Sequence, residues 1–222
     1  MESAIKVQNL GLMPYGEALL HQERCHTDVV EGGRPVILTV EHPSVLTLGK
    51  NAHSGNLLFG REFYRSLGVD VFETDRGGEV TAHMPGQLVV YPIIPVLSLG
   101  YSAKSYIALL EDSVIEVLAG YGLKAQCDAQ FPGVWIEDRK ICAIGVRIKQ
   151  RVSMHGLALN VCNPLDLFSK IVPCGIQTRS VTSMTEELGK KIDLNEVRTD
   201  LVQTILNKAS LFCGRNLSET PN

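Results

Sequence analysis

The chain has 222 residues, of which 45% are hydrophobic, and carries a formal net charge of −3 at neutral pH. This length and composition suffice to bury a complete core, and we expect residues 1–222 to form a single domain. The weak negative charge argues against broad electrostatic binding to nucleic acid or to an anionic membrane surface. No apolar run approaches the roughly 20 residues that a membrane-spanning helix needs. Because the N-terminus also lacks an apolar signal core and an Arg-rich transit sequence, we expect a soluble, cytoplasmic protein.

The first third of the chain is predicted to form two helices that are each followed by a strand. A proline near the start and glycines at the end favour a helix within Leu12–Gly33. The β-branched run Pro35–Val40 predicts a buried strand. A short helix over Arg61–Leu67 then precedes an alternating strand over Val69–Glu73.

The next third begins with a strand and a long helix. Gln87–Ile94 has the composition of a strand, in which Pro92 indicates an edge strand or the end of the strand. Ser102 is placed to cap a helix that runs to Ala119, with Gly120 as its stop.

The remaining segments favour antiparallel strands. Gly133–Ile136 and Ile141–Ile148 flank four charged residues, a pattern typical of a hairpin, and Ser153–Val161 predicts a further strand. Asp193–Glu196 resembles a capping box that opens a helix through about Ala209. Strands mixed with helices, without strict alternation, predict an α+β fold with a largely antiparallel or mixed sheet.

The cysteines predict neither disulfides nor a metal site. Six are scattered along a chain with no export signal, which favours reduced thiols, and neither a CxxC motif nor zinc-ligand spacing occurs. Cys174 differs from the others because it lies between Pro173 and Gly175, where a sharp turn could present its thiol to a substrate. The alternative is a small apolar side chain that fills a corner of the core.

A glycine-rich segment, Asp75–Gln87, is expected to form a loop between two strands. The glycines of Arg76-Gly77-Gly78 allow a ligand to approach the backbone closely, and Arg76 could bind an anion or a carbonyl oxygen. Neither a phosphate-binding P-loop nor GxGxxG is present, so the segment does not imply a nucleotide. A structural turn and a structural histidine at His83 remain the alternatives.

Three further features are weak when taken singly. Lys140 lies where the second strand of the hairpin begins, and it could equally be a solvated lysine at the hairpin tip. In Ala143-Ile144-Gly145 the glycine leaves bare backbone against which a ligand chain could lie, and His155-Gly156-Leu157-Ala158 repeats this pattern. A β-bulge and a core histidine are the corresponding alternatives.

Taken in order, these segments resemble one enzyme family. Arg76-Gly77-Gly78 with Thr81, His83 and Gln87, then Lys140 to Gly145, His155 to Asn160 and Pro173 to Ile176, resemble the octanoyltransferases of lipoate biosynthesis, the lipoyl(octanoyl) transferase family. His42 to Gly49 is similar to the N-terminal signature of that family, so the resemblance spans about residues 4 to 190. The chain departs from the family pattern at Ala82, Met84 and Cys142.

The resemblance implies a fold like the catalytic domain of biotin and lipoate protein ligases, with a curved mixed sheet flanked by helices. It also implies that Cys174 accepts octanoyl from octanoyl-acyl carrier protein as a thioester. The acyl group would then pass to a lysine on lipoyl domains of 2-oxoacid dehydrogenase E2 subunits or on the glycine cleavage H protein. Lys140 would stabilise the thiolate and later act as general base, since a nearby ammonium lowers the pKa of a thiol.

The resemblance implies no cofactor and no ATP, and we expect a monomer. The expected substrate-binding residues are Arg76, Gly77, Gly78, Glu79, Val80, Thr81, Ala82, His83, Ala143, Ile144, Gly145, His155, Gly156, Leu157 and Ala158. The alternatives are an ATP-dependent lipoate or biotin protein ligase, a cysteine hydrolase that pairs Cys174 with His83 or His155, and a binding protein without turnover.

Overall fold

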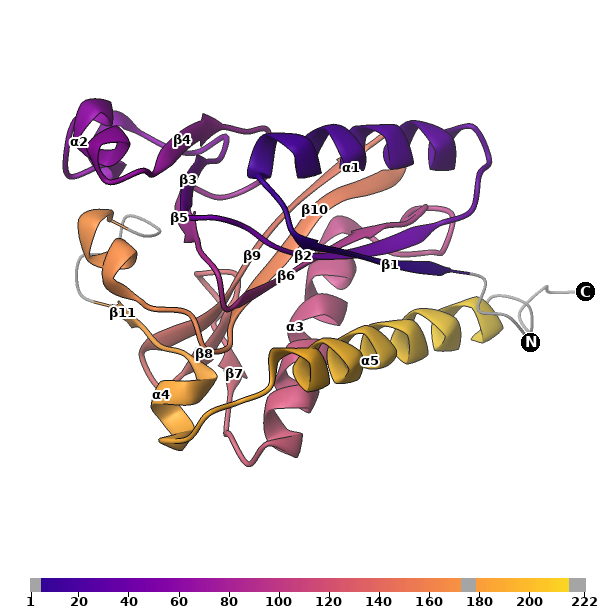
Figure 1. The fold of residues 1–222 in the computed structure, drawn as a ribbon. Helices are drawn as coiled ribbons and strands as arrows, with labels where there is room; N and C mark the ends of the chain where they lie inside the picture. The colour runs from indigo at the N-terminus through magenta and orange to yellow at the C-terminus, as the bar shows by residue number, and fades with distance from the viewer. Residues whose placement is uncertain (1–4, 173–178, 216–222) are drawn as a thin grey trace, which may run out of the picture.

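The computed structural model describes residues 5–172 and 179–215, with side chains described except at Ser54 and residues 210–215. Within these residues a large sheet runs through the middle of the molecule (Figure 1). Its strands, in spatial order, are β1 (Lys6–Leu12), β2 (Val36–Glu41), β6 (Gln87–Ile93), β10 (Val152–Asn160), β9 (Arg139–Lys149), β8 (Val134–Ile136) and β7 (Gln126–Cys127), and β11 (Ser180–Val181) also pairs with β9.

The large sheet is mixed and mostly antiparallel, as the sequence predicts. β1 pairs with β2 in parallel and β11 with β9 in parallel, whereas the other neighbouring strands are antiparallel. Of the two alternatives predicted from Pro92, the edge strand does not hold, because β6 lies between β2 and β10, whereas the end of the strand does. Pro92 does lie near the end of β6, beyond Val90, the last residue of β6 that pairs with β10. Its missing N–H therefore removes no hydrogen bond to β10.

Helices cover both faces of the large sheet. Figure 1 shows α1 (Tyr15–Val30) on one face and α3 (Ala103–Gly120) with α5 (Leu194–Arg215) on the other. Ser102 caps α3 by accepting a hydrogen bond from the Ser105 amide, as its position in the sequence predicts. The shorter helical segments are η1 (Ser54–Asn56), α2 (Arg61–Ser66), η2 (Asp166–Lys170) and α4 (Met184–Leu188). No helix in the described ranges combines the length and the apolar character needed to cross a membrane.

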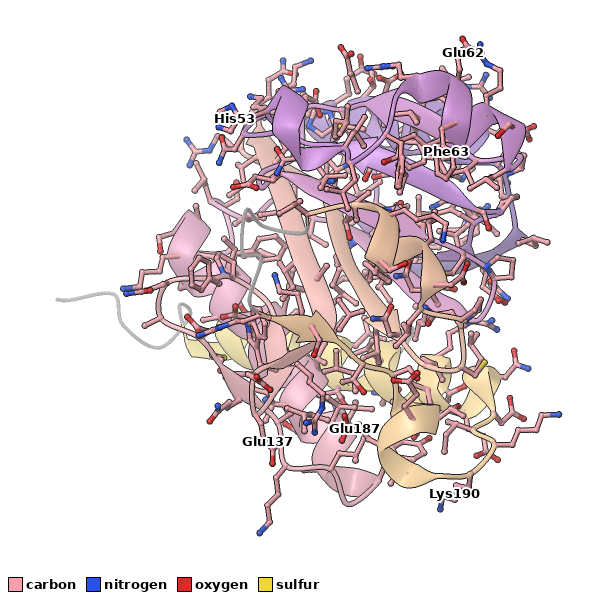
Figure 2. All side chains as sticks on the ribbon, turned by 90° about the vertical axis from the view of Figure 1, so that its left-hand side faces the viewer. His53, Glu62, Phe63, Glu137, Glu187 and Lys190 are labelled. Carbon is pink, nitrogen blue, oxygen red and sulfur yellow. The ribbon has the colours of Figure 1, made fainter. Side chains whose placement is uncertain are left out.

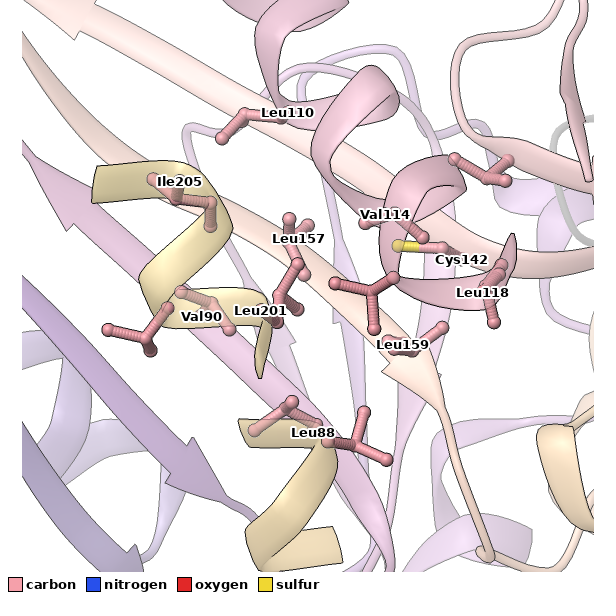
Figure 3. Close-up of a cluster of buried hydrophobic side chains, with 14 of the residues drawn as sticks. Leu88, Val90, Leu110, Val114, Leu118, Cys142, Leu157, Leu159, Leu201 and Ile205 are labelled. Carbon is pink, nitrogen blue, oxygen red and sulfur yellow. The ribbon is translucent and has the colours of Figure 1, made fainter. Parts of the chain in front are cut away.

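The main core lies between the large sheet and the α3–α5 pair (Figure 3). Leu88 and Val90 of β6 and Leu157 and Leu159 of β10 point into it, where they meet Leu201 of α5. Because side chains alternate along a strand, the residues between them face α1 instead. That second face carries the cavity described below.

A smaller sheet packs against one end of the large one and has its own core. Its strands are β4 (Asp70–Glu73), β3 (Val45–Leu48) and β5 (Val80–His83). Leu46, Ala82 and Phe168 contribute to its core. The prediction of a loop throughout Asp75–Gln87 is wrong over β5, because these residues gain a ladder of hydrogen bonds to β3 that local sequence does not reveal.

Candidate active site

A cavity lies on the face of the large sheet that carries α1. Residues of three neighbouring strands line it, among them Gln87, Val89 and Tyr91 of β6; Gly156, Ala158 and Asn160 of β10; Ala143 and Gly145 of β9. The register places Ala158 between Val89 and Ala143, and Gly156 opposite Gly145. The cavity has a volume of about 190 Å³, and these small residues form part of its floor. The arrangement suits a long, narrow apolar ligand.

The segment Arg76–Val80 forms a wall of this cavity and lies directly on β9. The amide of Gly77 donates to the carbonyl oxygen of Val146 at 3.0 Å. A Cβ atom on Gly145 would lie 2.8 Å from the carbonyl oxygen of Gly77, which is closer than side chains approach backbone. Gly145 is therefore required for the segment to cross the strand.

Arg76 holds this segment to the small sheet. The side chain is 8% exposed, and its guanidinium donates to the carbonyl oxygen of Thr47 at 2.5 Å, to Thr47 Oγ1 at 2.9 Å and to the carbonyl oxygen of Glu79 at 2.9 Å. The sequence predicted an anion or a carbonyl oxygen as the partner of Arg76, and the structure shows carbonyl oxygens. In the structure these N–H groups bond to acceptors of the chain itself and organise the wall.

His83 is a buried, neutral imidazole in a hydrogen-bonded network. Gln87 Nε2 donates to the carbonyl oxygen of Ala82 and to Asn160 Oδ1, which leaves Gln87 Oε1 to accept from His83 Nδ1 at 2.8 Å. His83 Nε2 can then accept from Thr47 Oγ1, 3.4 Å away. Burial, with smaller effects from His42 and Arg76, lowers the pKa of His83 to about 3.

His155 is similarly restrained at the end of the cavity near Arg76. Its backbone has a φ of 57°, and its amide donates to Gln22 Oε1 at 3.1 Å. Its Nε2 bonds to Asp75 Oδ1 at 2.8 Å, and Arg147 forms an ion pair with the same carboxylate. Burial lowers the pKa of His155 to about 4. Both predicted histidines thus have partners that fix them in place.

The buried histidines predict that acid destabilises the fold. Burial lowers the pKa of His42, like that of His155, to about 4 and that of His83 to about 3, from 6.5. The unfolded chain takes up protons below pH 6.5 that the folded chain does not, so stability is complete above that pH and is lost as the pH falls toward 4. We expect each histidine to reduce the free energy of unfolding by about 2 kcal/mol at pH 5.

Urea denaturation at pH 7, 6 and 5 measures this effect. His155→Asn is the matched variant, because asparagine tolerates a positive φ and does not titrate in this range. His155→Asn should reduce the change in the free energy of unfolding between pH 7 and pH 5 by about a third, because it removes one of the three buried histidines. An unfolding free energy that is unchanged between pH 7 and pH 5 would contradict the prediction.

A β-bulge turns Lys140 toward the cavity. β8 pairs Val134 with Cys142 but the next residue, Trp135, with Lys140, so Ile141 is an extra residue on β9. Ile141 and Cys142 consequently both pack in the main core, and Lys140 lines the cavity together with Ala143. Bulges often re-aim side chains at functional sites in this way.

The surroundings of Lys140 exclude the alternative of a solvated hairpin tip. The side chain is 7% exposed, and its Nζ donates to the carbonyl oxygen of Pro132 at 3.2 Å. The same Nζ lies 4.7 Å from the centre of the Trp135 ring. A Cβ atom on Gly133 would lie 3.4 Å from Lys140 Cε, so the lysine packs closely on that glycine.

Cys174 lies outside the described residues, but the chain on both sides of its segment is held near the cavity. The amide of Val172 donates to the carbonyl oxygen of Asn56 at 2.9 Å. On the other side, Val181 pairs with Lys140 in the sheet and lines the cavity. Figure 2 faces this side of the molecule, with His53 near one edge of the small-sheet region and Glu137 at the β8–β9 turn.

Comparison with known proteins shows to which family the chain belongs. The model of the lipoyl protein ligase A/B catalytic domain matches residues 14–206. The chain belongs to this family. An octanoyltransferase from Bacteroides fragilis is 43% identical over 206 residues, covering 88% of this chain and 93% of the relative. An octanoyltransferase from Deinococcus radiodurans is 45% identical over 197 residues, covering 84% of this chain and 58% of the relative, so the chain spans little more than half of that protein.

Solved structures of lipoate and biotin ligases share the fold. A bipartite lipoate protein ligase from Thermoplasma acidophilum has a TM-score of 0.70 at 15% identity, covering 92% of this chain and 83% of the ligase. A biotin protein ligase from Aquifex aeolicus has a TM-score of 0.54 at 15% identity, covering 93% of this chain and 70% of the ligase. These likenesses confirm the predicted ligase-like α+β fold.

Within the described part of the chain, which leaves out Cys174, the predicted site residues gather at this cavity with one exception. Lys140 and the predicted substrate-binding residues line it, apart from Ala82, which packs in the core of the small sheet. The family departures at Met84 and Cys142 are likewise core residues and do not line the cavity. The lining residues that sequence reasoning did not select include Tyr15, Gln87, Val89, Tyr91, Pro132, Asn160, Phe168 and Val181. The alternation along β6 was the available signal for Gln87, Val89 and Tyr91.

Proposed function

We propose that the chain is an octanoyltransferase that moves octanoyl from octanoyl-acyl carrier protein, through a Cys174 thioester, to a lysine of a lipoyl domain or of the glycine cleavage H protein. The observation that carries the proposal is a buried Lys140 amine at one end of an apolar cavity with a small-residue floor. Relatives named octanoyltransferase that are 43–45% identical support it. The hydrogen bond to Asn56 holds Val172 in place. Because Cys174 follows two residues later, the chain allows at most about 7 Å between the Cα atoms of Val172 and Cys174.

The order of the lining residues along β9 defines how the acyl chain would lie in the cavity. Lys140 lies near the start of β9, followed by Ala143 opposite Ala158 and then by Gly145 opposite Gly156. Two residues along a strand span roughly 6.6 Å, so the floor continues well beyond the lysine. With the thioester carbonyl near Lys140, the alkyl chain would lie over the alanines and end near the Arg76–Val80 wall.

The proposed chemistry proceeds in two acyl transfers. The Cys174 thiolate attacks the carrier-protein thioester, an S–C bond forms to Cys174, and the bond between the acyl carbon and the pantetheine sulfur breaks. The Lys140 ammonium donates its proton to the departing pantetheine sulfur and is left as a neutral amine. The acceptor amine then attacks the new thioester, the Cys174 S–C bond breaks, and an amide forms while Lys140 accepts the proton of the amine. His83 and His155 are less suited as the base, because their ring nitrogens already bond to Gln87 and Asp75.

A reaction without ATP tests the proposal. The protein is mixed with octanoyl-acyl carrier protein and a lipoyl domain, and the domain is analysed by intact mass. We expect an octanoyl group on the acceptor lysine without nucleotide. Modification that requires free octanoate and ATP would contradict the proposal and favour an ATP-dependent lipoate or biotin ligase.

Ala143 is expected to limit the acyl-chain length. Ala143→Leu adds bulk to the middle of the cavity floor and should lower kcat/KM for octanoyl about tenfold relative to hexanoyl, since one methylene is worth roughly 10- to 200-fold in a close-fitting pocket. Competition between hexanoyl- and octanoyl-carrier proteins measures the ratio. Ala119→Leu, on the exposed end of α3, is the matched control. An unchanged ratio in Ala143→Leu would exclude this path for the chain.

A further inference from the structure

Trp135 is the only tryptophan in the chain, and it lies beside two cations. The residue is 2% exposed. The centre of its ring lies 4.7 Å from Lys140 Nζ and 4.8 Å from the guanidinium carbon of Arg179. The two positive charges repel each other. The negative face of the indole ring attracts each of them, and this attraction is strongest where water is excluded.

The turn that precedes Trp135 is built to hold Lys140. Trp135 Nε1 donates to the carbonyl oxygen of Phe131 at 3.1 Å, which fixes the plane of the ring. The amide of Gly133 donates to Glu111 Oε1 at 2.9 Å and ties the turn to α3. The Lys140 side chain packs on this glycine and bonds to the carbonyl oxygen of Pro132.

The same turn holds Arg179. Arg179 pairs with Asp128 Oδ2 at 2.5 Å, and its guanidinium carbon lies 5.2 Å from the centre of the Phe131 ring. Asp128 Oδ1 accepts from the amides of Gln130 and Phe131, so the carboxylate that binds the arginine also shapes the turn. The segment from Asp128 to Trp135 therefore holds both Lys140 and Arg179.

We propose that Trp135 is a positioning residue for acyl transfer, whose ring holds the ammonium of Lys140 at the cavity and the guanidinium of Arg179 beside it. The inference rests on the proposed function of Lys140. An aliphatic side chain of similar bulk would fill the space but would leave a buried ammonium with fewer partners, free to sample other rotamers. The ring thus acts on the reaction through the lysine and not through contact with the substrate.

Two substitutions separate positioning from packing. Trp135→Phe and Trp135→Leu both remove buried volume, but only phenylalanine keeps an aromatic face. We expect kcat for octanoyl transfer at pH 7 to be about tenfold lower in Trp135→Leu than in Trp135→Phe, with similar melting temperatures and an unchanged KM for the acceptor. Equal kcat values in the two variants, or a loss that follows melting temperature, would overturn the proposal.

Fluorescence tests the contact without reference to activity. Because Trp135 is the sole tryptophan, Lys140→Met should change its emission, whereas Lys149→Met, at the far end of β9, should not. An unchanged spectrum in Lys140→Met would overturn the contact itself. If the spectrum responds but no form of the protein transfers octanoyl, the proposed function fails while the contact stands. If the protein is active and the phenylalanine and leucine variants are equal, the positioning role fails.

Discussion

Cys174→Ala is expected to reduce octanoyl transfer at least about 10³-fold, because removal of a nucleophile removes the covalent route entirely. The unmodified protein should acquire one octanoyl group when it is incubated with octanoyl-acyl carrier protein alone. Intact-mass analysis measures the adduct, and hydroxylamine should remove it, as expected for a thioester. Peptide mapping should place the adduct on Cys174.

The other cysteines provide internal controls. Partial burial and the nearby Glu111 raise the pKa of Cys127 to about 11, partial burial and Glu41 raise that of Cys162, and full burial raises that of Cys142. Thiols of this kind are poor nucleophiles at neutral pH, because little thiolate is present. Cys127→Ala and Cys162→Ala, at exposed positions, should leave transfer unchanged. An adduct on Cys142 or Cys162, or none at all, would refute the mechanism.

Local patterns in the sequence predicted the hairpin but not the position of its key residue. Four charged residues between two apolar runs suffice to predict the turn, because the signal is local. The bulge at Ile141 gives no comparable signal in the sequence. The residues after Lys140 are apolar, so the pattern is the same with or without the bulge. Whether Lys140 points to solvent or to the cavity depends on β8 pairing, which is a tertiary feature. The resemblance to a family, not the pattern, identified the lysine.

The floor of the cavity could be predicted only in part for a similar reason. Glycines and alanines on β9 and β10 are visible in the sequence as room for a ligand. Tyr15 and Tyr91 come from α1 and β6, which lie next to these strands only because β6 pairs with β10. Strand order is not encoded locally, so these aromatic lining residues were missed. β5 was missed because its pairing with β3 outweighs the weak strand preference of Ala82 and His83.

Lys140→Ala is expected to lower the rate of octanoyl transfer about 10²- to 10³-fold at pH 7, because a general base contributes roughly 10²- to 10⁴-fold. At pH 9 the loss should be smaller, because hydroxide then generates both the Cys174 thiolate and the neutral amine of the acceptor without the lysine. Rates of acceptor octanoylation measured from pH 6 to pH 10 give the comparison. Lys149→Ala, an exposed lysine on the same strand, is the control and should follow the unmodified protein.

The two half-reactions separate the two roles of Lys140. If its ammonium stabilises the thiolate, Lys140→Ala should slow the appearance of the Cys174 adduct before any acceptor is added. If it also acts as base toward the incoming amine, a preformed adduct should transfer slowly in the same variant. The buried Nζ bonds to the carbonyl oxygen of Pro132 beside the cavity, and we propose that this one lysine serves both steps. A loss of rate that is equal at every pH would leave Lys140 with a structural role only, and normal adduct formation with slow transfer would restrict it to the second step.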